Sequence, residues 1–369
     1  MSDGSRLDRF LVLGCGGFIG SHFLDRLLAD HTVFVEGYDL DSTKITDHLQ
    51  SPRFRFNKTC IHDAHLSGRL EQSIRDANVV INLAAICNPA EYNRHPLNVM
   101  RHNCFYMIPI LEACAELQKW IIHFSTSEVY GRTIASYLKE KDYSDPDLFE
   151  QSEDETPLIM GPIHKQRWSY ATAKQLVERY IFALHKEAGL KFTIIRPFNF
   201  FGPRMDYIRD RDGEGVPRVL ACFMEALLDG KPMKLVDGGR AKRTITSIHD
   251  AIDALFLMIR NPNAAQNQIF NVGSAENEVS IAQLALLMRE IFADVTGDVS
   301  AKQHPIEHVS SLEFYGEGYE DCDRRVPDMT KANQLLGWSP TRSLQQTLKE
   351  AITYYYKEYG CRRLSLAAQ

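Results

Sequence analysis

The chain has 369 residues, of which 44% are hydrophobic and 24% charged, and its formal net charge is -6 at pH 7. The negative charge argues against an electrostatic nucleic-acid binder, and the longest apolar stretches, such as 79–86, fall short of the roughly 20 residues that cross a bilayer. We therefore expect no nucleic-acid and no membrane partner, and the lack of a signal-peptide core at the N-terminus favours a cytoplasmic location.

The first two thirds of the chain alternate short β-branched runs with longer helical patterns. The runs predict strands at 10–13, 33–38, 79–84, 120–124 and 192–196. Helical periodicity between them predicts helices at 18–28, 97–117 and 170–188, of which the last two suit the interface of a homodimer. Strands spaced by helices predict an α/β fold with a doubly wound parallel sheet, a Rossmann domain over residues 1–200.

A second, smaller unit is expected after residue 200, where the alternation loosens. Glycines and prolines gather at 203–217 and 237–239, and serine followed three residues later by glutamine opens apolar helical runs at Ser280 and Ser343. We expect a smaller α/β nucleotide-sugar-binding domain over 201–369, with segments of about 240–270 returning to the Rossmann core. The polar segment 132–167 predicts a long loop.

The cysteines and histidines give no sign of a metal site. The eight cysteines are scattered without a CxxC pair, and the 13 histidines lack the clustered spacing of zinc ligands. We expect reduced thiols and no metal.

A glycine-rich turn follows the first predicted strand and opens the first helix. Glycines three residues apart let the backbone approach a pyrophosphate at the positive end of the helix. Asp39 ends the second strand about 20 residues further on, where a carboxylate accepts hydrogen bonds from the adenosine ribose and disfavours a 2'-phosphate. This pattern predicts NAD rather than NADP, although a solvated turn aspartate is the alternative for Asp39. The turn residues expected at NAD are Gly14, Gly17, Phe18, Ile19 and Gly20.

Tyr170 and Lys174 are four residues apart and therefore share one face of a helix. A lysine in that position favours the phenolate of the tyrosine, which can then act as a base. The strand at 120–124 runs directly into Thr126, Ser127 and Glu128, which can bind a sugar hydroxyl and transfer a proton. Taken alone, the pair could be a surface feature and the Ser/Thr cluster an ordinary turn.

Together these features resemble the extended short-chain dehydrogenases. Further segments at 82–93, 165–170, 196–199, 214–218 and 314–319 resemble the UDP-glucuronate decarboxylase group, which includes the UDP-apiose/UDP-xylose synthases and the decarboxylase domain of the bacterial aminoarabinose pathway enzyme. The resemblance runs from about residue 10 to 359. It implies NAD-dependent oxidative decarboxylation of UDP-glucuronate through a UDP-4-keto intermediate, followed by ring contraction and reduction to UDP-apiose with UDP-xylose as co-product.

The resemblance also assigns roles to individual residues. Arg325 would grip the substrate carboxylate, since a guanidinium matches a carboxylate bidentately; a surface arginine paired with Asp321 or Asp323 is the alternative. Cysteines occupy two active-site positions in the plant synthases, of which this chain keeps Cys87 and replaces the other with Ser127. The remaining cofactor residues implied are Ile61, Leu83, Ala85, Asn103, Tyr170 and Lys174. The substrate residues implied are Tyr92, Arg167, Asn199, Arg218, Lys234, Arg243, Tyr319, Asp321 and Arg325.

Two departures keep other functions open. A serine is a poor substitute for a thiol, so Ser127 leaves the ring contraction open, and a decarboxylase that stops at UDP-xylose or the UDP-4-ketopentose is the alternative. Cys60 stands where relatives usually carry Asp or Asn near the adenine. A catalytically silent NAD-binding scaffold or regulatory protein is the alternative of another class, against which the intact tyrosine and lysine argue.

Overall fold

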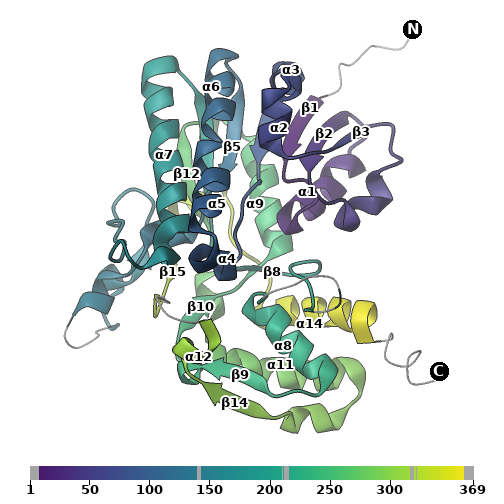
Figure 1. The fold of residues 1–369 in the computed structure, drawn as a ribbon, viewed down its shortest axis with the longest axis vertical. Helices are drawn as coiled ribbons and strands as arrows, with labels where there is room; N and C mark the ends of the chain where they lie inside the picture. The colour runs from purple at the N-terminus through teal and green to yellow at the C-terminus, as the bar shows by residue number, and fades with distance from the viewer. Residues whose placement is uncertain are drawn as a thin grey trace.

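A seven-stranded parallel sheet forms the centre of the fold (Figure 1). The computed structural model describes residues 8–138, 143–209, 211, 216–315, 320 and 322–360. The strand order is β12-β7-β5-β4-β1-β2-β3, and each neighbouring pair is parallel. The strands are β1 (Asp8–Leu13), β2 (Val33–Asp39), β3 (Phe54–Lys58), β4 (Val79–Asn82), β5 (Trp120–Phe124), β7 (Lys191–Pro197) and β12 (Gln268–Val272). The predicted doubly wound sheet is confirmed, while β3 and β12 were not predicted.

Each face of the sheet has its own hydrophobic core, because successive side chains of a strand point to opposite faces. In β1, Phe10 and Val12 lie in one core, and Leu11 and Leu13 lie in the other. Helices α1 (Phe18–Ala29) and α9 (Ile248–Arg260) contribute to the first core. Helices α3 (Arg69–Asp76), α6 (Ile108–Glu116) and α7 (Ser169–Ala188) contribute to the second. A helix from beyond residue 240 thus covers the same face of the sheet as the first helix of the chain.

The predicted helix over 97–117 is present as a helical segment that is interrupted rather than regular. The segment divides into α5 (Pro96–Met100), a π-helical turn η2 (Arg101–Phe105) and α6. Pro109 interrupts the helical hydrogen bonds at the start of α6, because proline has no amide hydrogen to donate to the preceding turn. The π-helical turn holds the fully buried Asn103. The described part of the predicted loop 132–167 contains short 3-10 turns and the two-residue strand β6 (Glu150–Gln151).

The second unit lies beneath the sheet in the view of Figure 1 and consists mainly of helices around two small strand pairs. Both predicted capping boxes are present: Ser280 accepts a hydrogen bond from the backbone of Gln283, and Ser343 from that of Gln346. Its main elements are α8 (Val219–Asp229), β9 (Met233–Val236), β10 (Lys242–Thr244), β13 (Glu278–Ser280), α11 (Ile281–Thr296), β14 (Ile306–Val309) and α14 (Leu344–Tyr355). Shorter elements are α2 (Ile61–Leu66), α4 (Pro89–Arg94), β8 (Phe200–Phe201), β11 (Thr246–Ser247), α10 (Pro262–Ala265), α12 (Ser311–Tyr315), β15 (Val326–Pro327) and α13 (Thr330–Leu336).

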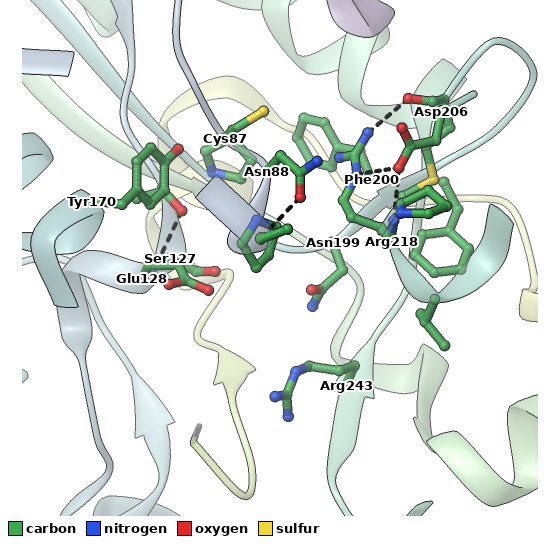
Figure 2. A pocket seen from close by; sticks show the side chains of 18 of the residues that line it. Cys87, Asn88, Ser127, Glu128, Tyr170, Asn199, Phe200, Asp206, Arg218 and Arg243 are labelled. Carbon is green, nitrogen blue, oxygen red and sulfur yellow. Dashed lines mark hydrogen bonds and ion pairs between the residues drawn. The ribbon is translucent and has the colours of Figure 1, made fainter. Parts of the chain in front are cut away.

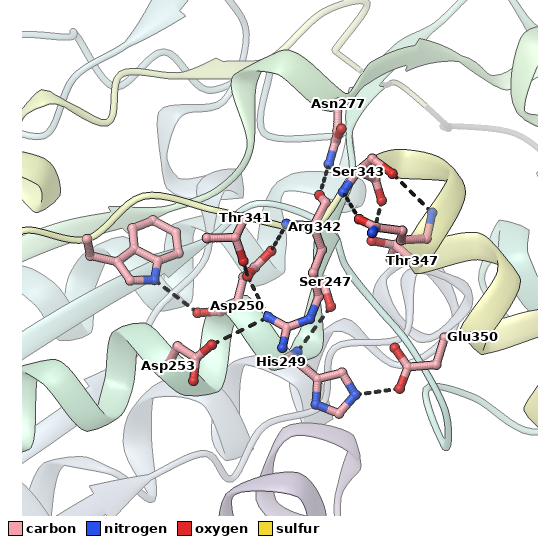
Figure 3. Close-up of polar contacts among 12 residues, drawn as sticks. Ser247, His249, Asp250, Asp253, Asn277, Thr341, Arg342, Ser343, Thr347 and Glu350 are labelled. Carbon is pink, nitrogen blue, oxygen red and sulfur yellow. Dashed lines mark hydrogen bonds and ion pairs between the residues drawn. The ribbon is translucent and has the colours of Figure 1, made fainter.

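A polar cluster fastens α9 of the sheet layer to the segment that leads into α14 (Figure 3). The buried carboxylate of Asp250 accepts hydrogen bonds from the Thr341 hydroxyl at 3.0 Å and from the Arg342 guanidinium at 2.6 Å. His249, the residue before Asp250, lies 2.6 Å from the carboxylate of Glu350. These contacts hold the C-terminal helix against the sheet layer. Among the described residues, no helix is long and apolar enough to span a membrane.

Candidate active site

A cavity of about 1090 Å³ lies at the C-terminal ends of the central strands, between the sheet and the second unit. Loops after β1, β4, β5 and β7 line it from one side, and residues between 205 and 325 line it from the other (Figure 2). Open parallel sheets bind their ligands at this edge. The cavity brings together the following predicted residues: Gly14, Gly17, Phe18, Ile19, Gly20, Leu83, Ala85, Cys87, Tyr92, Thr126, Ser127, Glu128, Arg167, Tyr170, Lys174, Asn199, Arg218, Lys234, Arg243 and Arg325.

The glycine-rich turn fits a dinucleotide. Gly14 has a φ of +86°, and a Cβ there would lie 2.7 Å from the backbone nitrogen of Ala84. At Gly17 a Cβ would meet only the carbonyl oxygen of Gly14, at 3.4 Å, so this glycine leaves space on the cavity side rather than avoiding a clash within the protein. Gly17 precedes α1 and makes no side-chain cap. The first N–H groups of α1 therefore remain available to a pyrophosphate.

Three predicted cofactor residues support this end of the cavity without lining it. Asp39 accepts hydrogen bonds from the backbone of Gly16 at 2.8 Å and of Leu40 at 2.7 Å, and burial raises the pKa of its carboxyl. Asn103 donates to the carbonyl oxygens of Ile86 at 3.0 Å and Val99 at 2.8 Å. It therefore holds the loop after β4 in place. Ile61 is buried at the start of α2.

Tyr170 and Lys174 project from the first turns of α7 next to the end of β5. The Tyr170 ring stacks on Tyr92 with centroids 4.9 Å apart, and the Lys174 ammonium donates to the carbonyl oxygen of Phe124 at 2.9 Å. Burial, followed by the charges of Cys87 and Glu128, raises the pKa of Tyr170 well above its usual value. Burial lowers the pKa of Lys174 to about 8. Among these protein groups, burial thus outweighs the expected stabilisation of a phenolate.

Glu128 lies between two arginines in the wall of the cavity. Arg167 holds its carboxylate with two hydrogen bonds, the longer at 2.7 Å, and Arg325 donates to the same carboxylate at 3.2 Å. The side chains of Arg167 and Arg325 are only 5% and 3% exposed. The two guanidinium groups hold the pKa of Glu128 well below its usual range despite burial. The two arginines therefore hold Glu128 in place as an ionised carboxylate of low basicity, and its acid/base role stays a prediction.

The opposite wall carries cationic and amide groups from the second unit (Figure 2). Asn199 has a positive φ of 41° and donates to the carbonyl oxygen of Thr244 at 3.0 Å. Arg218, Arg243 and Lys234 line this wall, as predicted. Tyr319 and Asp321 lie outside the described residues. Sequence reasoning missed other lining residues, among them Asn88, Asp206, Arg240 and Tyr315.

The sequence profile of the NAD dependent epimerase/dehydratase family matches residues 10–273. The chain belongs to this family. It is an enzyme of the extended short-chain dehydrogenase type, and NAD is its cofactor, as predicted.

Individual relatives match most of the chain. The UDP-D-apiose/UDP-D-xylose synthase of Oryza sativa subsp. japonica is 49% identical over 359 residues, which cover 94% of this chain and 89% of the relative. UDP-D-apiose/UDP-D-xylose synthase 1 of Arabidopsis thaliana is 49% identical over 362 residues, covering 95% and 91%. The predicted resemblance to these synthases is confirmed.

Solved structures show the same fold. The PbgP3 protein from Burkholderia pseudomallei has a TM-score of 0.80 and 30% identity, covering 96% of this chain and 98% of that chain. The UDP-glucuronic acid 4-epimerase from Bacillus cereus, solved with UDP-glucuronic acid and NAD, has a TM-score of 0.76 and 24% identity over 95% of this chain and 100% of that one.

Proposed function

We propose that the enzyme is a UDP-apiose/UDP-xylose synthase that decarboxylates UDP-glucuronate. The observation that carries this proposal is the pair of buried arginines, Arg167 and Arg325, in the same cavity as Tyr170. Both guanidinium groups contact the carboxylate of Glu128, and a guanidinium in this wall also suits the carboxylate of a sugar acid. The identity of 49% to the plant synthases supports the same substrate.

Oxidation of the sugar begins with a proton transfer to this chain. Tyr170 takes the proton of the C4 hydroxyl as the phenolate, so it must first lose its own proton. The Lys174 ammonium on the same face of α7 and the Thr126 hydroxyl hydrogen-bonded to the phenol favour that ionisation against the effect of burial. NAD, which the glycine turn before α1 would hold, would supply the redox chemistry as a hydride acceptor and donor and would be recycled rather than consumed. The stacked ring of Tyr92 fixes the plane of the Tyr170 ring.

Decarboxylation then follows from the chemistry of the oxidised sugar. A ketone at C4 makes the compound a β-keto acid, so the bond between C5 and the carboxyl carbon breaks and its electron pair moves into an enolate at the C4 oxygen. Hydrogen-bond donors at that oxygen stabilise the developing charge. The protonated Tyr170 and the buried hydroxyl of Ser127 are the donors in the cavity.

The last stage divides between two products. Reduction of the 4-ketopentose gives UDP-xylose, while cleavage of the C2–C3 bond and closure of a smaller ring before reduction give UDP-apiose. Cys87 lies exposed on the loop after β4, and Ser127 lies buried at the end of β5. The serine at the second position supports a larger share of UDP-xylose than a thiol there would give.

Incubation of the purified protein with UDP-glucuronate and NAD tests the proposal. We expect release of carbon dioxide together with both UDP-apiose and UDP-xylose in the NMR spectrum of the nucleotide sugars. UDP-glucose, which has no carboxylate, serves as the control and should give neither product. A protein that binds NAD and UDP-glucuronate but leaves the sugar unchanged would contradict the proposal.

We further propose that the enzyme is a homodimer that pairs through the helices on the α7 side of the sheet. Leu97, Phe105, Leu176 and Phe182 are 67%, 55%, 48% and 42% exposed on α5, η2 and α7. Exposed apolar side chains on neighbouring helices support an interface there. Light scattering during gel filtration measures the mass, and Phe105→Glu should shift it towards that of the monomer.

The cytoplasmic location stays a prediction, which cell fractionation can test.

A further inference from the structure

Arg218, which faces the cavity from the start of α8, is held from behind by Asp206. Its backbone N–H and its Nε–H both donate to Oδ2 of Asp206, at 2.9 and 3.2 Å, and one Nη donates to the carbonyl oxygen of Met205 at 2.7 Å. Figure 2 shows this pair across the cavity from Tyr170 and Glu128. The rear edge of the guanidinium is thus saturated by protein acceptors.

The other Nη of Arg218 has no hydrogen-bond partner among the residues that the structure describes, and a third of the side chain is exposed. The geometry therefore leaves one edge of the planar group facing the cavity. A guanidinium with one edge fixed and one edge open is preorganised for an anion, because little side-chain entropy remains to be lost when the anion binds.

The backbone of Asp206 is in turn fixed by a residue of the C-terminal helix. The hydroxyl of Tyr355 accepts a hydrogen bond from the Asp206 N–H at 2.8 Å and donates to the Asp206 carbonyl oxygen at 2.9 Å. Tyr355 is fully buried and does not line the cavity. Any influence that it has on a bound ligand is therefore indirect, and its hydroxyl makes both of its hydrogen bonds with Asp206.

We propose that Asp206 and Tyr355 are positioning residues for the binding of the nucleotide diphosphate. The chain of contacts runs from Tyr355 through the backbone of Asp206 to the guanidinium of Arg218, which meets the diphosphate. This inference rests on the proposed function only in taking a nucleotide diphosphate as the ligand of that wall. We expect both residues to affect the affinity for the substrate and neither to take part in the chemical step.

A double-mutant cycle on the holoenzyme tests the proposal, with UDP as the ligand in calorimetry. Tyr355→Phe removes one hydroxyl and should raise the Kd of UDP about fivefold, the effect of one net hydrogen bond. The KM of UDP-glucuronate should rise by the same factor, while kcat and the Kd of NAD stay within twofold. In an Arg218→Ala background, Tyr355→Phe should have no further effect on UDP.

Matched variants keep the result interpretable. Tyr356→Phe removes the next hydroxyl on the same helix, from a ring that packs edge-on against Phe292, and should leave the Kd of UDP unchanged. Asp206→Asn keeps the size of the side chain and should weaken UDP binding as Tyr355→Phe does. Tighter UDP binding by Asp206→Asn would show that its charge mainly repels the diphosphate. That outcome, or additive losses in the Arg218→Ala background, would overturn the proposal. The double-mutant cycle with UDP can be interpreted even if the protein does not turn over UDP-glucuronate, because it measures only the Kd of UDP.

Discussion

Replacement of Arg325 by alanine should weaken the binding of UDP-glucuronate far more than that of UDP-glucose. The Arg325 side chain is 3% exposed, and its guanidinium donates to Glu128 at 3.2 Å and to the carbonyl oxygen of Gly131 at 3.4 Å. In the variant, Arg167 still holds Glu128 with two hydrogen bonds, while the sugar carboxylate loses the guanidinium of Arg325. The lost charge-assisted contact costs roughly 2 to 4 kcal/mol in a desolvated site.

Calorimetry with both ligands on the NAD-loaded protein measures this difference directly. A loss of roughly 2 to 4 kcal/mol corresponds to an increase in Kd of about 30-fold or more. Arg324→Ala is the neighbouring control, because this guanidinium pairs with Glu278 and lies over the ring of Phe149. An equal loss for UDP-glucose and UDP-glucuronate would show that Arg325 is structural, and the argument from the buried arginines would fail.

Three further substitutions test other parts of the site. Tyr170→Phe should lower the release of carbon dioxide about 10²- to 10⁴-fold with unchanged NAD affinity, because the phenol acts in proton transfer; undiminished turnover would exclude that role. Ser127→Cys should raise the ratio of UDP-apiose to UDP-xylose in NMR product analysis, and an unchanged ratio would exclude position 127 as the cause. Burial lowers the pKa of Lys174 to about 8, so between that pH and about 10 the unfolded chain holds a proton that the folded protein has released. In that pH range Lys174 therefore makes the free energy of unfolding rise with pH, by up to about 1.4 kcal/mol per pH unit. Lys174→Met should remove that rise from the free energy of unfolding, and the exposed Lys191→Met should keep it.

The sequence predicted the parts of the fold that depend on local pattern. The five strands rich in β-branched residues and the two capping boxes are where the pattern placed them. The strands β3 and β12 were missed for different reasons. In β3, Phe54 and Phe56 alternate with polar residues at the edge of the sheet, which is a weak signal in five residues. β12 pairs with β7 at a distance of about 75 residues, with Gln268 opposite Thr193, which no local pattern reveals.

The same limit applies to the site. The glycine turn, Tyr170 and Lys174 were found because their spacing along the chain is itself the signal. Asp206 was missed because its role depends on contacts with Arg218 and with Tyr355, which lies 149 positions further along the chain. The contacts of Glu128 with two arginines were not predicted for the same reason, since these arginines come from loops that only the fold brings together.

The two arginines around Glu128 also bear on how the proposed reaction ends. Buried guanidinium groups need a counter-charge, and both of these contact the Glu128 carboxylate. In the proposed reaction the carboxylate of UDP-glucuronate binds beside them. Carbon dioxide carries that carboxylate away during the reaction and leaves the pentose products without it. On the proposed function, Arg325 should therefore contribute to the binding of UDP-glucuronate but not to that of the products, which would favour product release over inhibition of the next turnover.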